Sequence, residues 1–162
     1  MPGILPIRAS YCISVVIDLE VGSFPNGGYS NNPMDPGGET KWGICKRDHP
    51  SLDIFNLTIQ DAVSIYYTDY WLKFHCDQLL VPIDLCFFDS CVHQGNFAAT
   101  QCLQKACGIV QDGLMGPVTI RAASKVSAKR YLAERARRYM TLPEFPTFGN
   151  GWLIRLFTLC TR

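Results

Sequence analysis

The first apolar pattern along the chain has the spacing of a helix. Ile13, Val16 and Ile17 fall at three- and four-residue intervals within residues 10–20, and Glu20 takes the next position of the same stripe. Residues at these intervals share one helical face. We therefore expect a helix over 10–20 that buries this face and carries an acid at its C-terminal end.

Further helices are expected where the apolar spacing recurs between turn residues. Thr58 and Asp61 have the spacing of an N-terminal capping pair. The expected helices cover 58–71, 82–92, 97–107, 118–140 and 152–160. Residues 23–38 instead form a loop rich in Gly, Pro and Asn. The pattern predicts a mainly α fold with a small hairpin and loop region near residues 23–45.

Composition narrows the class of protein. The 162 residues suffice for one well-packed domain without a metal or disulfide staple, and 48% apolar residues exclude a disordered chain. The net charge of +1 argues against nucleic acid as a partner, and no stretch reaches the ~20 apolar residues of a stable membrane insertion. Asp18 and Glu20 close the apolar run at 11–19 without a small-residue cleavage site. We expect no cleaved secretion signal, and an uncleaved export role stays open.

The eight cysteines include no Cys-x-x-Cys pair. We expect reduced, mostly buried thiols, because cysteine is a small core residue and these spacings are not those of a disulfide scaffold. His49, His75 and His93 have no ligand spacing with the cysteines, so we expect no metal. No cofactor is implied by any motif.

Positive charge is concentrated between residues 121 and 138, where seven Lys and Arg residues face one acid, Glu134. Two interpretations stay open for this basic stripe. It is either a solvated helix face or a surface that holds an anionic polymer by electrostatic attraction.

Glu20 is the strongest candidate for chemistry. Its place on an apolar stripe, at the negative end of a helix, disfavours a charged carboxylate. A carboxylic acid that stays protonated near neutral pH is what a general acid requires. The alternative is an ordinary helix-end glutamate whose side chain turns into solvent.

The loop that follows supplies partners for such an acid. Asp35, Glu39 and Thr40 offer a carboxylate or hydroxyl that positions water opposite Glu20, although Asp35 is equally a turn residue. Cleavage of a glycosidic bond uses an acid on the leaving oxygen and a partner on the other face of the sugar. A carboxyl separation of roughly 6.5–9.5 Å gives inversion, and roughly 5–5.5 Å gives retention.

Several motifs together resemble glycoside hydrolase family 108, the N-acetylmuramidases of phage endolysins and prophage regions. The loop motifs are Glu20-Val-Gly22, Gly28 to Pro33, Asp35 to Thr40 and Trp42-Gly43-Ile44. Downstream matches are Asp69-Tyr70-Trp71, Leu85 to Gly95, Leu103 to Ala106, Asp112-Gly113 with Gly116-Pro117, and Gly151 to Leu153 with Arg155. The resemblance covers roughly residues 11–156.

The resemblance implies a lysozyme-like helical domain that cleaves the β-1,4 bond between N-acetylmuramic acid and N-acetylglucosamine in peptidoglycan. Residues 1–95 would be the catalytic region, and 96–162 resemble a predicted peptidoglycan-binding segment packed in the same globular unit. Glu20 would be the general acid, with Asp35 and Thr40 as stabilising or water-orienting groups. The expected substrate-binding residues are Tyr29, Glu39, Tyr70 and Trp71. Tyr70 and Trp71 form either a sugar-stacking wall or part of the core.

One departure from the family bears directly on the acid. The family usually has Glu-Gly-Gly before this tyrosine, whereas here the tripeptide before Tyr29 is Asn26-Gly27-Gly28. A gap-free alignment puts Asn26, which cannot donate a proton, at the acid position, and the protein would then be inactive. If residues 23–27 are an insertion, Glu20-Val21-Gly22 is the equivalent tripeptide. We favour the insertion, because it places the acid directly after the helix, whose last turn would not accommodate Pro25.

Rival readings follow from these alternatives. A lytic transglycosylase would use the same acid, with the substrate's own hydroxyl in place of water. A non-catalytic peptidoglycan-binding protein would follow from the Asn26 alignment. As a phage endolysin, the protein would be a monomer made in the host cytoplasm that reaches the periplasm and cell wall at lysis. Within the expected helices, Asp89 is either a paired structural acid or a loop anchor, and His93 is expected to be a hydrogen-bonded structural residue.

Overall fold

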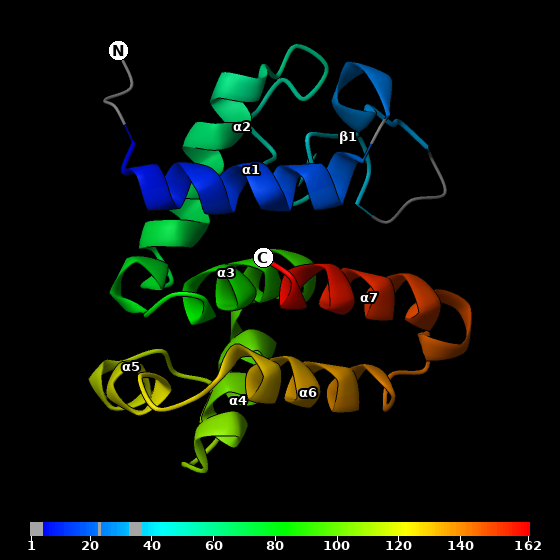
Figure 1. The fold of residues 1–162 in the computed structure, drawn as a ribbon. Coiled ribbons are helices and arrows are strands. Elements are labelled where there is room, and N and C mark those ends of the chain that lie inside the picture. The colour runs from blue at the N-terminus through cyan, green and yellow to red at the C-terminus, as the bar shows by residue number, and fades with distance from the viewer. Residues whose placement is uncertain (1–4, 23, 33–36) are drawn as a thin grey trace. The chain divides into compact units, whose positions relative to one another are not determined.

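The computed structural model describes residues 5–22, 24–32 and 37–162, which are mainly helical, as expected (Figure 1). The chain folds as two units, residues 1–69 and residues 70–162. Residue 95, after which we expected the C-terminal region to begin, lies inside the second unit. In the described part of the chain, no helix is both long and apolar enough to span a bilayer.

The first unit begins with the expected amphipathic helix. Helix α1 spans Ile7–Val21, three residues longer at its start than the apolar pattern predicts. Ile13, Val16 and Ile17 are buried, as the spacing indicates. The helix ends where Gly22 adopts the left-handed conformation, with φ of 57°.

A two-stranded hairpin follows the loop. Strands β1 (Thr40–Lys41) and β2 (Ile44–Cys45) are antiparallel and are joined by a two-residue turn. Ser30 pairs with Thr40 through two backbone hydrogen bonds of 2.8 and 2.9 Å, which attach the preceding loop to β1. The small hairpin expected in the region near residues 23–45 is thus confirmed.

Helix α2 (Ile59–Ile65) begins with the predicted cap. The Thr58 hydroxyl accepts from the Asp61 N–H at 3.2 Å, and the Asp61 carboxylate accepts from the Thr58 N–H at 3.0 Å. The helix continues to Leu72, one residue beyond the expected end, but its second half, Tyr66–Leu72, is a π-helix rather than an α-helix.

The second unit is a bundle of helices. It contains α3 (Ile83–Gln94), α4 (Asn96–Cys107), α5 (Pro117–Ala123), α6 (Ala128–Tyr139) and α7 (Phe145–Cys160). Helix α3 packs against α4 and α6, and α6 packs against α7. Helix α4 ends at Gly108 with φ of 72°, as the sequence predicts. Helix α7 begins seven residues earlier than expected.

The prediction of a single long helix over 118–140 is wrong. The structure has α5 and α6 with a break between them at residues 124–127. Ser127 acts as the N-cap of α6, because its hydroxyl accepts from the Arg130 N–H at 3.3 Å. The apolar spacing on the two sides of the break is compatible with one helix. The Ser127 cap is the local feature that marks the start of a separate helix α6.

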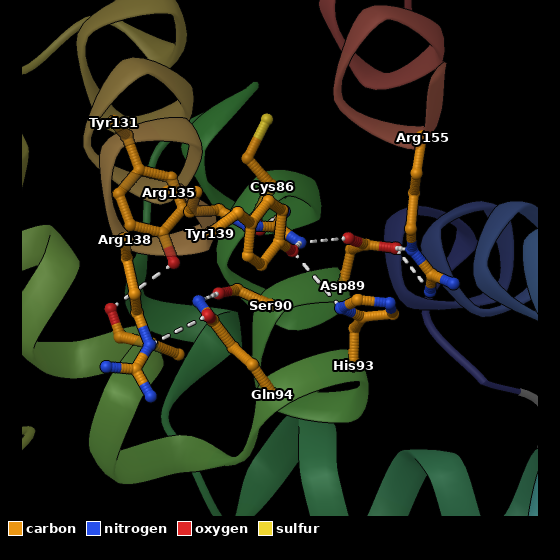
Figure 2. Close-up of polar contacts among 11 residues, drawn as sticks. Cys86, Asp89, Ser90, His93, Gln94, Tyr131, Arg135, Arg138, Tyr139 and Arg155 are labelled. Atoms are coloured by element: carbon orange, nitrogen blue, oxygen red, sulfur yellow. Dashed lines mark hydrogen bonds and ion pairs between the residues drawn. The ribbon is translucent and has the colours of Figure 1, made fainter. Parts of the chain in front are cut away.

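A buried ionic cluster joins three of these helices, as Figure 2 shows. Asp89 of α3 has no exposed surface and accepts from Arg135 of α6 at 2.8 Å and from Arg155 of α7 at 2.7 and 2.8 Å. Asp89 is therefore a paired structural acid. Burial opposes its charge, but the two guanidinium groups outweigh burial and lower its pKa. Since Arg135 is fully buried, it is not part of the basic stripe, and the stripe is smaller than the sequence indicates.

His93 extends this cluster. Arg135 donates to the Tyr139 hydroxyl at 2.9 Å, and that hydroxyl lies 3.1 Å from His93 Nδ1. The arrangement suits a neutral His93 whose Nδ1 accepts a hydrogen bond from the Tyr139 hydroxyl. Burial, together with the charges of Arg155 and Arg135, lowers the His93 pKa to about 4. His93 is hydrogen-bonded within the bundle, as expected of a structural histidine.

The eight cysteines all lie in the described parts of the chain, and no disulfide joins any two of them. Five of them are buried, in agreement with the expectation of mostly buried thiols: Cys12, Cys76, Cys86, Cys91 and Cys102. Burial raises the pKa of Cys86 to about 12, because a thiolate would be desolvated there.

Asp89→Asn should lower the free energy of unfolding by about 3–5 kcal/mol, because it leaves two buried guanidinium groups without their counter-charge. Urea unfolding followed by circular dichroism measures the change. The matched control is Asp48→Asn, which breaks the ion pair between Asp48 and Arg47. Because these side chains are 49% and 61% exposed, respectively, this variant should lose less than about 1 kcal/mol of unfolding free energy. Equal losses in the two variants would contradict a structural role for the cluster.

His93 should make stability depend on pH. Its pKa lies near 4 in the folded state and at 6.5 in the unfolded chain, so between these values only the unfolded state binds the proton. The contribution is fully present above pH 6.5 and falls by about 3 kcal/mol as the pH drops to 4. Urea unfolding at several pH values should show this slope in the wild type and its loss in His93→Gln.

Candidate active site

Glu20 lies in the last turn of α1 with its side chain against the hairpin turn. A β-carbon placed on Gly43 would come within 3.0 Å of Glu20 Cγ and 3.1 Å of Glu20 Cβ. Glu20 is half-buried there. The end of α1 and the turn of the hairpin, more than twenty residues apart in the chain, therefore meet at this acid.

The hairpin turn is fixed from its other side by Tyr66. The buried Tyr66 hydroxyl donates to the Trp42 carbonyl oxygen at 3.1 Å, and a β-carbon on Gly43 would overlap this hydroxyl. Gly43 has φ of 76°, a conformation that favours glycine. Only glycine at position 43 allows Glu20 and Tyr66 to approach the turn as closely as they do.

Thr40 lies on β1, two residues before this turn. Its hydroxyl donates to the Gly38 carbonyl oxygen at 3.2 Å, and its backbone pairs with Ser30. The structure thus places Thr40 on the same hairpin that Glu20 contacts. Asp35, the other expected catalytic partner, lies outside the described residues.

Tyr29 and Glu39, two of the expected substrate-binding residues, are directly paired. The Tyr29 hydroxyl donates to Glu39 Oε1 at 2.9 Å, and this bond to a carboxylate raises the pKa of Tyr29. The Tyr29 ring meets Phe55 edge-on, with centroids 5.3 Å apart. Tyr29 thus contacts both Glu39, directly before β1, and Phe55, in the segment that precedes α2.

Tyr70 and Trp71 belong to the second unit. The Trp71 side chain is only 3% exposed and packs edge-on against Phe88 at a centroid distance of 5.4 Å. The ring has no open face for a sugar, which corresponds to the core alternative that the sequence left open. Tyr70 is half-buried and lies edge-on to Phe74 at 6.0 Å.

Sequence reasoning missed a pocket of about 550 Å³ in the first unit. We call it the Trp42 pocket. It is lined by Asn26, Tyr29, Lys41, Trp42, Phe55, Asn56, Leu57 and Thr58. The signal in the sequence was the Trp-Gly pair at the hairpin turn, because tryptophan is unusual in a two-residue turn that normally takes Asn-Gly. Among the described residues, no three His, Cys, Asp or Glu side chains are placed to hold a metal ion.

Comparison with known proteins supports the resemblance. Residues 25–95 match the family model described as Glycosyl hydrolase 108. Among solved structures, the one titled "Structure of Brucella abortus SagA" matches with a TM-score of 0.78 and 31% sequence identity, over 96% of this chain and 92% of that chain. The chain belongs to glycosyl hydrolase family 108. A search of curated proteins found no match.

The family assignment confirms the lysozyme-like, mainly α fold and supports a glycosidase that acts on peptidoglycan. The family match begins at Pro25. It therefore includes Asn26 and the two glycines before Tyr29, and it does not include Glu20. Asn26 lies in a short 3₁₀ segment, Pro25–Gly28, with φ of 56°. Glu20, in contrast, is at the end of α1, where the sequence analysis places the acid.

Gly43→Ala should destabilise the protein by about 1–3 kcal/mol more than Gly38→Ala, because its methyl group must displace Tyr66 or Glu20. Gly38 is a matched control, since its φ of 71° is also left-handed but the nearest atom to an added β-carbon is 3.9 Å away. Thermal unfolding of the two variants measures the difference. Equal destabilisation would mean that Glu20 and Tyr66 do not pack on the turn as described.

Proposed function

We propose that this protein is a muramidase that hydrolyses the β-1,4 bond between N-acetylmuramic acid and N-acetylglucosamine in peptidoglycan, with Glu20 as the general acid. The observation that carries the proposal is the contact between Glu20, at the end of α1, and the turn of the hairpin that bears Thr40. Membership of a glycosyl hydrolase family supports the reaction class.

In this mechanism, protonated Glu20 donates its proton to the glycosidic oxygen as the bond from that oxygen to the anomeric carbon breaks. Water then adds to the anomeric carbon and releases a proton to the solvent, from which the Glu20 carboxylate takes up a proton again, so that one water is consumed and the acid is regenerated. Thr40 orients this water through its hydroxyl, and Asp35 stabilises the positive charge that develops on the sugar. Gly43 and Tyr66 hold the hairpin turn against Glu20 and so act as positioning residues.

Tyr29 and Glu39 bind the glycan in this proposal. The Tyr29 ring offers an apolar surface to a sugar, and its bond to Glu39 fixes the ring in place. One oxygen of Glu39 accepts from Tyr29, and the carboxylate still has acceptor capacity for sugar hydroxyls. Their position in the loop next to the hairpin supports this role.

We also propose the setting in which the enzyme works. It is a monomeric endolysin that is made in the host cytoplasm and reaches the periplasm and cell wall at lysis, with glycan strands rather than nucleic acid as its partner. The family resemblance supports this placement, and a net charge of +1 fits a partner that is not recognised by bulk charge.

A second candidate function has its own observation. Because the family match begins at Pro25, Asn26 stands in the tripeptide that normally carries the acid. If position 26 is the acid position, the protein binds peptidoglycan without cleaving it, since an amide cannot protonate the leaving oxygen. The two functions differ in a single measurable property, the release of glycan fragments.

The test is digestion of purified peptidoglycan, with released fragments identified by mass spectrometry. We expect the wild type to release fragments with reducing muramic acid ends and Glu20→Gln to be at least about 10²-fold slower, because it lacks the acid. The control is Asp18→Asn, an exposed acid of the same helix, which should keep wild-type activity. Asn26→Glu should gain nothing.

Each other outcome supports a different function or a different catalytic acid. An inert wild type whose Asn26→Glu variant cleaves peptidoglycan would establish the binding function and place the acid position at residue 26. Fragments that end in anhydro-muramic acid would identify a lytic transglycosylase. Wild-type rates in Glu20→Gln would show that another residue is the acid.

A further inference from the structure

The Trp42 pocket is built from rigid parts. Trp42 has φ of 55°, a conformation that costs roughly 1–2 kcal/mol for a residue with a β-carbon. Its N–H donates to the Gly27 carbonyl oxygen at 2.7 Å, and its indole Nε1 donates to the Leu57 carbonyl oxygen at 3.3 Å. A β-carbon on Gly27 would overlap the indole, so the ring lies flat on that glycine. The indole is therefore fixed in place without any ligand.

Other residues that line the pocket are also fixed by hydrogen bonds and ring contacts. The Lys41 ammonium donates to the Phe55 carbonyl oxygen at 2.7 Å, and the Asn56 side-chain amide donates to Asp53 at 2.8 Å. The Phe55 ring is 61% exposed and meets Tyr29 edge-on. Aromatic rings and amide groups thus line a preformed space of about 550 Å³, a size typical of small-ligand sites.

These walls fit a neutral sugar ring better than a charged group. The apolar C–H face of a pyranose packs on aromatic rings, while its hydroxyl and acetamido groups hydrogen-bond to amides such as Asn26 and Asn56. No carboxylate is among the described residues that line the pocket, and its one cation, Lys41, already donates to a backbone carbonyl. Charge therefore contributes little to recognition here.

We propose that the Trp42 pocket is a subsite for one uncharged N-acetylated amino sugar, N-acetylglucosamine, of the glycan strand. The inference rests on the proposed function for the choice of a glycan. Trp42 directly precedes Gly43, the residue on which Glu20 packs. A sugar held on the indole would therefore anchor the strand beside the acid. Hydrogen bonds to the Trp42 carbonyl oxygen and from its indole Nε1 hold the strained turn in this shape.

The test is a titration of the full chain with a tetrasaccharide of N-acetylglucosamine, followed by the NMR signals of the indole N–H groups. The chain has three tryptophans, so three such signals are expected. We expect the Trp42 signal to shift in a saturable way, while the signals of Trp71 and Trp152 stay in place. Trp42→Asn assigns the signal, because it removes the ring and puts a residue that favours this turn conformation in its place.

Phe55→Ala and Trp42→Asn should each weaken binding of the tetrasaccharide, measured by isothermal titration calorimetry, by about threefold to tenfold, since each removes one aromatic contact. Phe24→Ala is the matched control, because Phe24 is 73% exposed in the same unit and does not line the pocket. It should bind as the wild type does. Circular dichroism of each variant shows that the fold is kept.

Three outcomes would overturn the subsite: an unmoved Trp42 signal at saturating sugar, unchanged affinity in both pocket variants, or a Trp42 shift produced by a peptidoglycan stem peptide and not by the sugar.

Failure of the proposed function is distinguishable from these results. If the Trp42 signal shifts but peptidoglycan is not cleaved, the subsite stands and the hydrolysis does not. If peptidoglycan is cleaved and the signal stays in place, the subsite is wrong and the hydrolysis stands.

Discussion

The bundle of the second unit depends on one buried carboxylate. Asp89 cannot lie in an apolar interior unless its charge is compensated, and two guanidinium groups from α6 and α7 meet it there. Two guanidinium groups around one carboxylate leave a net positive charge, and the Tyr139 hydroxyl oxygen helps to accommodate it by accepting a hydrogen bond from Arg135. The same excess disfavours protonation of His93. Charge pairing therefore fixes which faces of α3, α6 and α7 point inward.

The first unit depends on a different constraint, the close packing of side chains on a two-residue turn. Glu20, Tyr66 and Trp42 converge at Gly43, and any side chain at that position would separate them. The turn holds Trp42 in a left-handed conformation that its contacts with Gly27 and Leu57 stabilise. Strain of this kind persists only where the surroundings compensate for it, and it is common at functional sites.

The family assignment and the local geometry bear on the acid in different ways. The family match includes Asn26, which has no proton to donate, whereas the geometry places a half-buried glutamate at a helix end against the hairpin. Both residues lie in the first unit, and Asn26 falls within residues 23–27, the segment that would be the insertion. The chemistry of the protein thus depends on which of two nearby positions faces the glycan.

Local patterns in the sequence determined much of this protein. The stripe of Ile13, Val16 and Ile17, the Thr58 cap and the glycine after α4 each act over a few residues, so α1, α2 and α4 were predictable. The loop motifs also indicated the family and the hairpin. The break before α6 was missed because apolar spacing continues across it, and the π-helical turn has no simple sequence signal. Tertiary structure alone decided the partners of Asp89, which lie 46 and 66 residues away, and the walls of the Trp42 pocket, because such contacts form only when distant segments pack.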